Sequence, residues 1–187
     1  YDPLNHIFMM NGPLGGIRAT AASRWVIVSK SPLATPEQYA YGNLGGRFGA
    51  ALKWAGLDGL DIVGAAAKPV ILVIAADGGC TFEDASRLWG KDTFETIASL
   101  QAAYGAEATV ATIGEAGENR VRFANVIGSG GVSATKGFGA VMGSKNLKAV
   151  VVRGRQTMLP VARPGPFKEV VAEILSLNKV MNPDVTI

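Results

Sequence analysis

Residues 128–148 read "GSGGVSATKGFGAVMGSKNLK", with six glycines between positions 128 and 143. Three lysines, Lys136, Lys145 and Lys148, lie in the same stretch. Glycine leaves room where another group approaches the backbone closely, and it adopts the positive φ of tight turns. The stretch therefore has two interpretations: a phosphate-bearing ligand comes close to this backbone, or the glycines make structural turns between packed elements.

The two familiar phosphate motifs do not fit this stretch. A dinucleotide fingerprint needs G-x-G-x-x-G and an acidic residue about 20 positions further on. Here "GFGAVMG" is spaced G-x-G-x-x-x-G, and the later segment "RQTMLPVARP" has no acidic residue. "GAVMGSK" places Ser144 where a P-loop requires lysine. A nucleotide-binding domain of either class is therefore not favoured.

A second glycine segment, "GNLGGRFG", occupies residues 42–49. Successive backbone N–H groups in glycine-rich turns form anion-binding nests. Each glycine segment also contains a cation, Arg47 in this one and Lys136 in the other, and Asn43 offers an amide oxygen to magnesium or a ligand. The residues alone leave a phosphate ligand and structural turns equally open, and Arg24 at the head of a strand fits an ordinary surface arginine.

Hydrophobic periodicity predicts several strands mixed with short helices, an α+β arrangement with at least one sheet. The clearest helix is 92–105, where Asp92 and Glu95 have capping-box spacing and Gly105 ends the pattern. We predict strands at 24–30, 108–113, 121–127 and 147–154, a strand pair or hairpin at 59–64 and 69–75, helices at 47–56 and 167–181, and a linker at 156–166.

Composition excludes several classes of function. The 187 residues carry a net charge of +3 with scattered basic residues, so a nucleic-acid partner is not expected. No apolar run reaches the roughly 18 residues of a membrane span, so no membrane association is expected. The single cysteine, Cys80, fits a turn in a reducing compartment, and the single histidine, His6, suggests no catalytic dyad or zinc site.

Five motifs together resemble one known family. They are "NGPLGG" (11–16), "GLDGLDIVG" (56–64), "DASRLWGK" (84–91), "IGEAGENRVRFA" (113–124) and "GFGAVMGSKNLKA" (137–149). In this order they resemble the N-terminal domain of the aldehyde:ferredoxin oxidoreductase family, tungsten- or molybdenum-containing enzymes, from Asp2 to Gly154. The resemblance implies an α+β fold of two β-sheets with a pseudo-two-fold relation and a few short helices, on which a bis-pterin cofactor sits.

The resemblance also implies the residues of a cofactor site. Arg24, Asn43 and Gly45 match family residues that contact the cofactor, and a magnesium ion bridging the pterin phosphates would meet Asn43 and a carbonyl near Val132. The full predicted set is Arg24, Asn43, Gly45, Gly46, Gly131, Val132, Ser133 and Lys136. Where the family often has "RAAGRGG", this chain has "GVSATKG", so Lys136 replaces an arginine only if the register shifts by one residue.

By the same resemblance, residues 1–154 are the pterin-binding domain, lacking its first strand, and 155–187 are a linker and the start of a helical domain. The [4Fe–4S] cysteines and the catalytic groups would lie further along a longer protein, so no catalytic residue is expected here. The implied reaction is cytoplasmic oxidation of small aldehydes to carboxylic acids with ferredoxin as acceptor. Alternatives are a subunit of a related tungsten enzyme such as benzoyl-CoA reductase, or a cofactor-free scaffold; the low surface charge is also compatible with a homo-oligomer.

Overall fold

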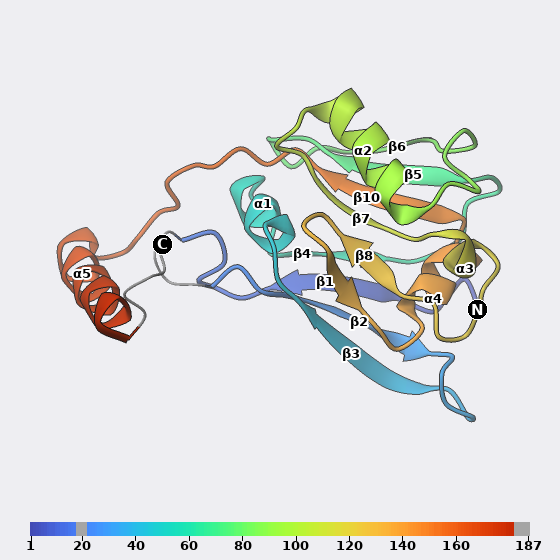
Figure 1. Ribbon diagram of the computed structural model, residues 1–187, viewed down its shortest axis with the longest axis horizontal. Coiled ribbons are helices and arrows are strands. Elements are labelled where there is room, and N and C mark those ends of the chain that lie inside the picture. The colour runs from blue at the N-terminus through green and yellow to red at the C-terminus, as the bar shows by residue number, and fades with distance from the viewer. Residues whose placement is uncertain (18–21, 182–187) are drawn as a thin grey trace.

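The computed structural model describes residues 1–17 and 22–181, which form two β-sheets with short helices between and beside them (Figure 1). The first sheet has the order β3-β2-β1-β4 and is antiparallel, and the second has the order β6-β5-β10-β7-β8-β9 with one parallel pair, β5 and β10. The strands are β1 (Ile7–Asn11), β2 (Trp25–Ser31), β3 (Gln38–Leu44), β4 (Gly59–Ile62), β5 (Val70–Ile74), β6 (Cys80–Asp84), β7 (Thr109–Thr112), β8 (Val126–Gly128), β9 (Val132–Ala134) and β10 (Leu147–Val152). The helices are α1 (Phe48–Trp54), α2 (Thr93–Tyr104), α3 (Glu115–Glu118), α4 (Phe138–Ser144) and α5 (Pro164–Met181). The predicted α+β class with two sheets is confirmed.

The main core lies between the two sheets. It combines inward side chains of the four-stranded sheet, such as Trp25 and Ile27, with Phe48 of α1, Phe138 of α4 and Val150 of the six-stranded sheet. A second cluster packs α2 on the other face of the six-stranded sheet. The central strands of the six-stranded sheet are therefore buried on both faces, which explains why all six residues of β10 are buried, whereas the edge strand β6 is exposed.

Two similar units build the centre of the fold. In each, a strand leads through glycine into a helix that begins Phe-Gly-Ala, and a further strand follows: β3, α1 and β4 in one unit, β9, α4 and β10 in the other. Phe48 and Phe138 occupy the same place in their helices and are buried with relative exposures of 3% and 0%. The correspondence fits the predicted pseudo-two-fold relation.

Two predicted strand assignments are wrong. Residues 59–64 and 69–75 do not form a hairpin, because β4 pairs with β1 in one sheet while β5 pairs with β6 and β10 in the other. Of the predicted strand 121–127, only Val126 and Ile127 are in β8, and the part before them forms turns. The prediction also missed β1, β3, β6, β9, α3 and α4. Cys80 is the exposed first residue of β6 and not a turn residue.

The glycines of "GFGAVMG" serve packing and not ligand approach. A Cβ at Gly143 would lie 1.9 Å from the carbonyl oxygen of Gly117, and one at Gly139 would lie 2.5 Å from that of Asn125. A Cβ at Gly137, where φ is +77°, would lie 2.2 Å from the carbonyl oxygen of Arg122. Helix α4 therefore rests directly on the backbone of residues 117–125.

Two of the three lysines in this stretch are also structural. Lys148 is fully buried, forms an ion pair with Glu118 and donates to the Lys91 carbonyl at 2.7 Å. Lys145 donates to the carbonyls of Pro3 and Gly64, both at 2.9 Å, and burial lowers its pKa below the ordinary lysine value. Both ammonium groups are fully occupied within the domain, so they are not available to a phosphate.

Replacing Gly143 by Ala tests this packing directly. We expect Gly143→Ala to lower the free energy of unfolding by about 3 kcal/mol, because the added methyl group meets backbone that cannot move aside as a side chain would. Gly12→Ala is the matched control, since a Cβ there meets nothing within 4 Å. Urea unfolding of both variants measures the difference, and a Gly143→Ala midpoint equal to that of the control would contradict the packing role.

Candidate functional site

The outward face of the four-stranded sheet is apolar and open. Its strands alternate between buried and outward residues, but the outward positions hold large apolar side chains where polar ones are usual. These outward residues are Phe8, Met10, Val26, Val28, Tyr39 and Tyr41, which belong to neither core cluster. Tyr39 is 72% exposed and Tyr41 56%. Exposed apolar patches of this kind mark binding sites in soluble proteins.

Strand pairing arranges these side chains in rows across the sheet. Phe8 pairs with Val28, which in turn pairs with Tyr41. Val26 in the next row pairs with Asn43, so this predicted site residue borders the apolar face. Two hollows of about 680 and 610 Å³ open here, and Tyr39 lines both of them. The face therefore offers an apolar surface with a polar edge at Asn43.

Arg24 and the glycine turn at residues 45–46 come together at the end of this edge. Trp25 pairs with Leu44 in the antiparallel sheet. Arg24, just before β2, and Gly45, just after β3, therefore lie at the same end of these strands. Trp25 fixes the turn, because its Nε1 donates to the Gly45 carbonyl at 3.2 Å. Within the described ranges, the side chains of Arg24 and Asn43 have neither a hydrogen bond nor an ion pair, which leaves both available to a ligand.

The glycine-rich turn that ends at Val132 lies against the glycine turn at residues 45–46. A Cβ at Gly45 would be 3.7 Å from Cγ1 of Val132, and one at Gly46 would be 3.3 Å from the Ser129 carbonyl oxygen. Residues 129–131 form the turn between β8 and β9, where Gly130 and Gly131 have φ of +85° and +77°. A Cβ at either glycine would meet nothing within 4 Å. These two glycines serve a tight turn exposed at the surface.

The remaining predicted residues follow along β9. Ser133 is exposed, and Lys136 lines the same hollow as Asn43, Tyr39 and Tyr41. The Lys136 backbone is held at φ +74°, and its carbonyl accepts from Ser31 Oγ at 2.5 Å. Its ammonium group has no partner in the part of the chain that the structure describes. The eight predicted residues are thus Arg24 and members of the segments 43–46 and 131–136. They lie at the junction of β3 and β9.

The lone histidine lies on the same open face. His6 Nδ1 is 2.7 Å from Asp61 Oδ1, and the His6 ring stacks on Phe8 with centroids 5.5 Å apart. No sequence pattern indicated this pair, because β1 and β4 are brought together only by the sheet. Among the described residues no group of three or more His, Cys, Asp or Glu side chains could hold a metal ion. Nor does any described helix have the length and hydropathy to cross a membrane.

Comparison with known proteins assigns the chain to a family. The family model "Aldehyde ferredoxin oxidoreductase, N-terminal domain" matches residues 1–154. The chain belongs to the aldehyde ferredoxin oxidoreductase family. It is 45% identical over 175 residues to a tungsten-containing aldehyde ferredoxin oxidoreductase of Pyrococcus abyssi, covering 92% of this chain and 28% of that protein. It is 36% identical over 170 residues to an aliphatic sulfonate oxidoreductase, WOR-like subunit, of Pyrococcus furiosus, covering 82% of this chain and 26% of that protein.

A solved structure has the same fold. The active-site complex BamBC of benzoyl-coenzyme A reductase, in complex with 1,5-dienoyl-CoA, contains a chain that matches with a TM-score of 0.89 and 36% identity. The match covers 100% of this chain and 29% of that one. The aldehyde ferredoxin oxidoreductase domain described here therefore spans less than a third of the relatives that it matches.

The sequence-based prediction did not identify the apolar half of the candidate site. Tyr39, Tyr41 and Asn43 alternate along "QYAYGN", and Phe8 and Met10 alternate along "HIFMMN". This period of two was the signal that could have revealed β1 and β3 and their shared face. The eight cofactor-binding assignments rest on the family resemblance and stay predictions; the structure shows only that they lie together and beside this face.

The accessible apolar face can be tested with a hydrophobic dye. We expect the double variant Phe8→Thr/Tyr41→Thr to bind clearly less anilinonaphthalene sulfonate than the unmodified chain, because two outward side chains of the face are removed. Its free energy of unfolding should change by no more than about 1 kcal/mol, since threonine suits strands and neither residue is in the core. Phe123→Thr is the control, since it removes one aromatic side chain at a position 70% exposed outside the face. Equal dye binding by all three proteins would contradict an open apolar face.

Proposed function

We propose that this chain is the cofactor-binding domain of a tungsten- or molybdenum-dependent oxidoreductase that oxidises aldehydes to carboxylic acids with ferredoxin as electron acceptor. The observation that carries the proposal is an open apolar sheet face with three polar groups at its edge, Arg24, Asn43 and Lys136, whose side chains have no partner within residues 1–17 and 22–181. The tungsten-containing relatives, 45% identical in one case, support the choice of metal.

The residues present fit a bis-pterin cofactor. A pterin is a flat heterocycle, and the outward side chains of β1, β2 and β3 supply a flat apolar surface. Its phosphate is anionic, and Arg24 and Lys136, which have no partner among the described residues, are cations at the edge of that surface. When bound, the cofactor supplies the metal centre at which the two-electron oxidation occurs, and the protein supplies binding and orientation.

Each predicted residue then has a defined task. Arg24 and Lys136 would pair with the phosphates, and the glycine turns 45–46 and 130–131 would offer backbone N–H groups to them. The Asn43 side chain and a carbonyl near Val132 would hold magnesium, whose preference is for oxygen ligands. Lys136 lines one hollow with Asn43. Its place there supports it as the cation that replaces the arginines of the family's second loop.

Other parts of the reaction would come from outside these residues. One exposed cysteine, Cys80, does not suffice for a [4Fe–4S] cluster. We propose that the cluster, the ferredoxin contact and the aldehyde pocket belong to the rest of a longer cytoplasmic protein, in keeping with the 28% of the Pyrococcus abyssi enzyme that this chain covers.

A benzoyl-CoA reductase-type subunit is the second candidate. It is favoured by the match to the BamBC chain, with 36% identity and a TM-score of 0.89. The same cofactor-binding face would serve either reaction, so the two candidates differ in substrate and in partner subunits. A cofactor-free scaffold is less favoured, because it gives no reason for three polar groups without a partner in the described structure beside an exposed apolar face.

Cofactor content in site variants tests the proposed function. In the native holoenzyme, Arg24→Gln and Asn43→Ala should each lower the affinity for the cofactor by at least about tenfold, since each removes a charged or metal-binding contact. The readouts are tungsten or molybdenum, magnesium and pterin phosphate per polypeptide after dialysis. We expect magnesium to fall first in Asn43→Ala.

Arg163→Gln is the matched control, because Arg163 is an exposed arginine immediately before α5 and away from the face. Thermal unfolding of the cofactor-free variants should match that of the unmodified protein. Full cofactor and magnesium content in both site variants would contradict the assignment of Arg24 and Asn43.

A further inference from the structure

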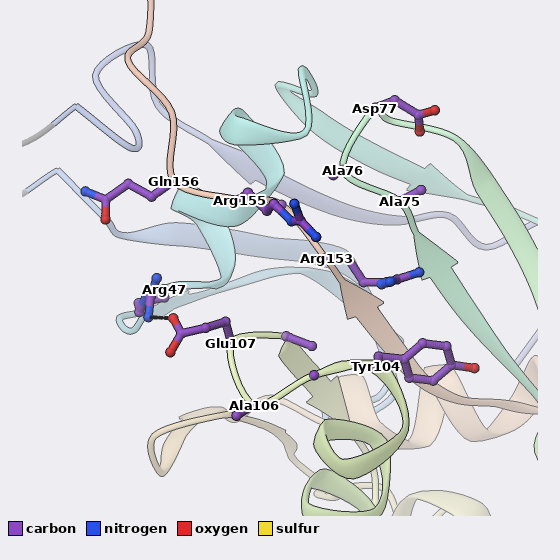
Figure 2. Close-up of a pocket in the computed structure, with 13 residues that line it drawn as sticks. Arg47, Ala75, Ala76, Asp77, Tyr104, Ala106, Glu107, Arg153, Arg155 and Gln156 are labelled. Atoms are coloured by element: carbon purple, nitrogen blue, oxygen red, sulfur yellow. Dashed lines mark hydrogen bonds and ion pairs between the residues drawn. The ribbon is translucent and has the colours of Figure 1, made fainter.

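A separate hollow of about 760 Å³ lies at the end of the six-stranded sheet where β5 and β10 both finish (Figure 2). Its walls are the turn after β5, the segment between α2 and β7, and the chain leaving β10. Arg47, at the start of α1, closes one side. None of the residues that line the hollow is among the eight predicted cofactor-binding residues.

The topology accounts for the hollow. β5 and β10 are parallel neighbours, so their carboxyl ends meet at one edge of the sheet. The chain after β5 turns back into β6, whereas the chain after β10 leaves towards α5. Diverging connections at the carboxyl ends of parallel strands leave a crevice, which is the usual ligand position in open sheets with parallel strands.

Two arginines in the hollow are unpaired. In the part of the chain described by the structure, the guanidinium groups of Arg153 and Arg155 form neither a hydrogen bond nor an ion pair. They are two residues apart, and Figure 2 shows both side chains in the space between the 75–77 turn and the Tyr104 segment. Two guanidinium groups left free in one crevice form a site for an anion with more than one negative oxygen.

The two carboxylates of the hollow are already occupied. Glu107 Oε2 accepts from Arg47 at 2.5 Å, and the Arg47 guanidinium also lies 5.8 Å from the centre of the Trp54 ring. Asp77 Oδ1 accepts from the Gly79 backbone N–H at 3.0 Å within its own turn. Neither carboxylate is bonded to Arg153 or Arg155, and the lining keeps a net positive charge because it has three arginines and two carboxylates.

Backbone donors and an aromatic ring add to these arginines. In residues 1–17 and 22–181, the N–H groups of Ala76 and Asp77 in one wall and of Ala106 and Glu107 in another have no hydrogen-bond acceptor. Tyr104 donates its hydroxyl to Glu83 at 2.7 Å, and burial together with this bond raises the pKa of Tyr104 to about 12. The ring is thus held in place as an uncharged wall of the hollow.

We propose that this hollow binds the diphosphate group of an organic ligand of nucleotide size, with Arg153 and Arg155 as its main contacts. Guanidinium groups bind phosphate oxygens in bidentate pairs, and unpaired backbone N–H groups complete such sites. A volume of about 760 Å³ exceeds what inorganic phosphate fills and lies within the range of small-molecule sites. This site neither uses nor requires the cofactor proposed above.

Titration calorimetry with ADP on the full 187-residue chain tests the proposal, with adenosine as the uncharged comparison. ADP should bind saturably at one site and adenosine should not bind. Arg153→Gln/Arg155→Gln should weaken the affinity for ADP by at least about tenfold, because two charge-assisted contacts are lost. Glu107→Gln should strengthen ADP binding, because it releases Arg47 from its ion pair.

Two control variants distinguish binding in this hollow from a general attraction of ADP to a basic chain. Arg163→Gln removes one positive charge outside the hollow, and Arg24→Gln removes one from the proposed cofactor face; both should bind ADP as the unmodified chain does. Thermal unfolding confirms that each variant is folded. The proposal is overturned if the unmodified chain does not bind ADP, if adenosine binds equally well, or if either control loses as much affinity as the double variant.

Discussion

Backbone-to-backbone contact between α4 and residues 117–125 is the constraint on which the rest of the structure depends. It requires glycine at positions 137, 139 and 143, since a Cβ at each would lie within 2.5 Å of a carbonyl oxygen. The contact sets where β9 ends and where β10 begins, and β10 is the central strand that joins β5 to β7. The buried pair of Lys148 and Glu118 ties β10 to the same 117–125 segment, and Glu118 also accepts from the Gly90 N–H at 2.8 Å.

This arrangement leaves the two sheets in different environments. The six-stranded sheet is enclosed by the main core and by α2, whereas the four-stranded sheet is covered on one face only. Because β3 lies beside β9, the glycine turns after β3 and before β9 come together at the edge of the open face. The site residues are few and at the surface, but their positions depend on the interior packing of α4.

Local sequence patterns predicted the elements whose formation depends on neighbouring residues in the chain. The apolar run "AVVV" in β10 and the cap of α2, where Asp92 accepts from the Glu95 N–H at 2.8 Å, are of this kind. Pairing partners were not predictable in the same way, because β4 and β5 are neighbours in sequence and yet join different sheets.

The glycines were ambiguous for a physical reason: a ligand and a packed backbone both demand the absence of Cβ. Gly143 and Gly131 look alike in the sequence, and only the contacts separate the first, against Gly117, from the second, in open space. The eight site residues came from family resemblance, and the apolar half of the site was recognised only once β1 and β3 were paired.

The open face of the four-stranded sheet is, in our proposal, the base of a metal–pterin cofactor in a larger oxidoreductase. Intact mass together with tungsten, molybdenum and iron analysis of the native protein is the decisive experiment. We expect a polypeptide much heavier than 19.4 kDa that carries tungsten or molybdenum together with iron. A native product of 19.4 kDa without these metals would contradict the proposal and would leave a scaffold domain.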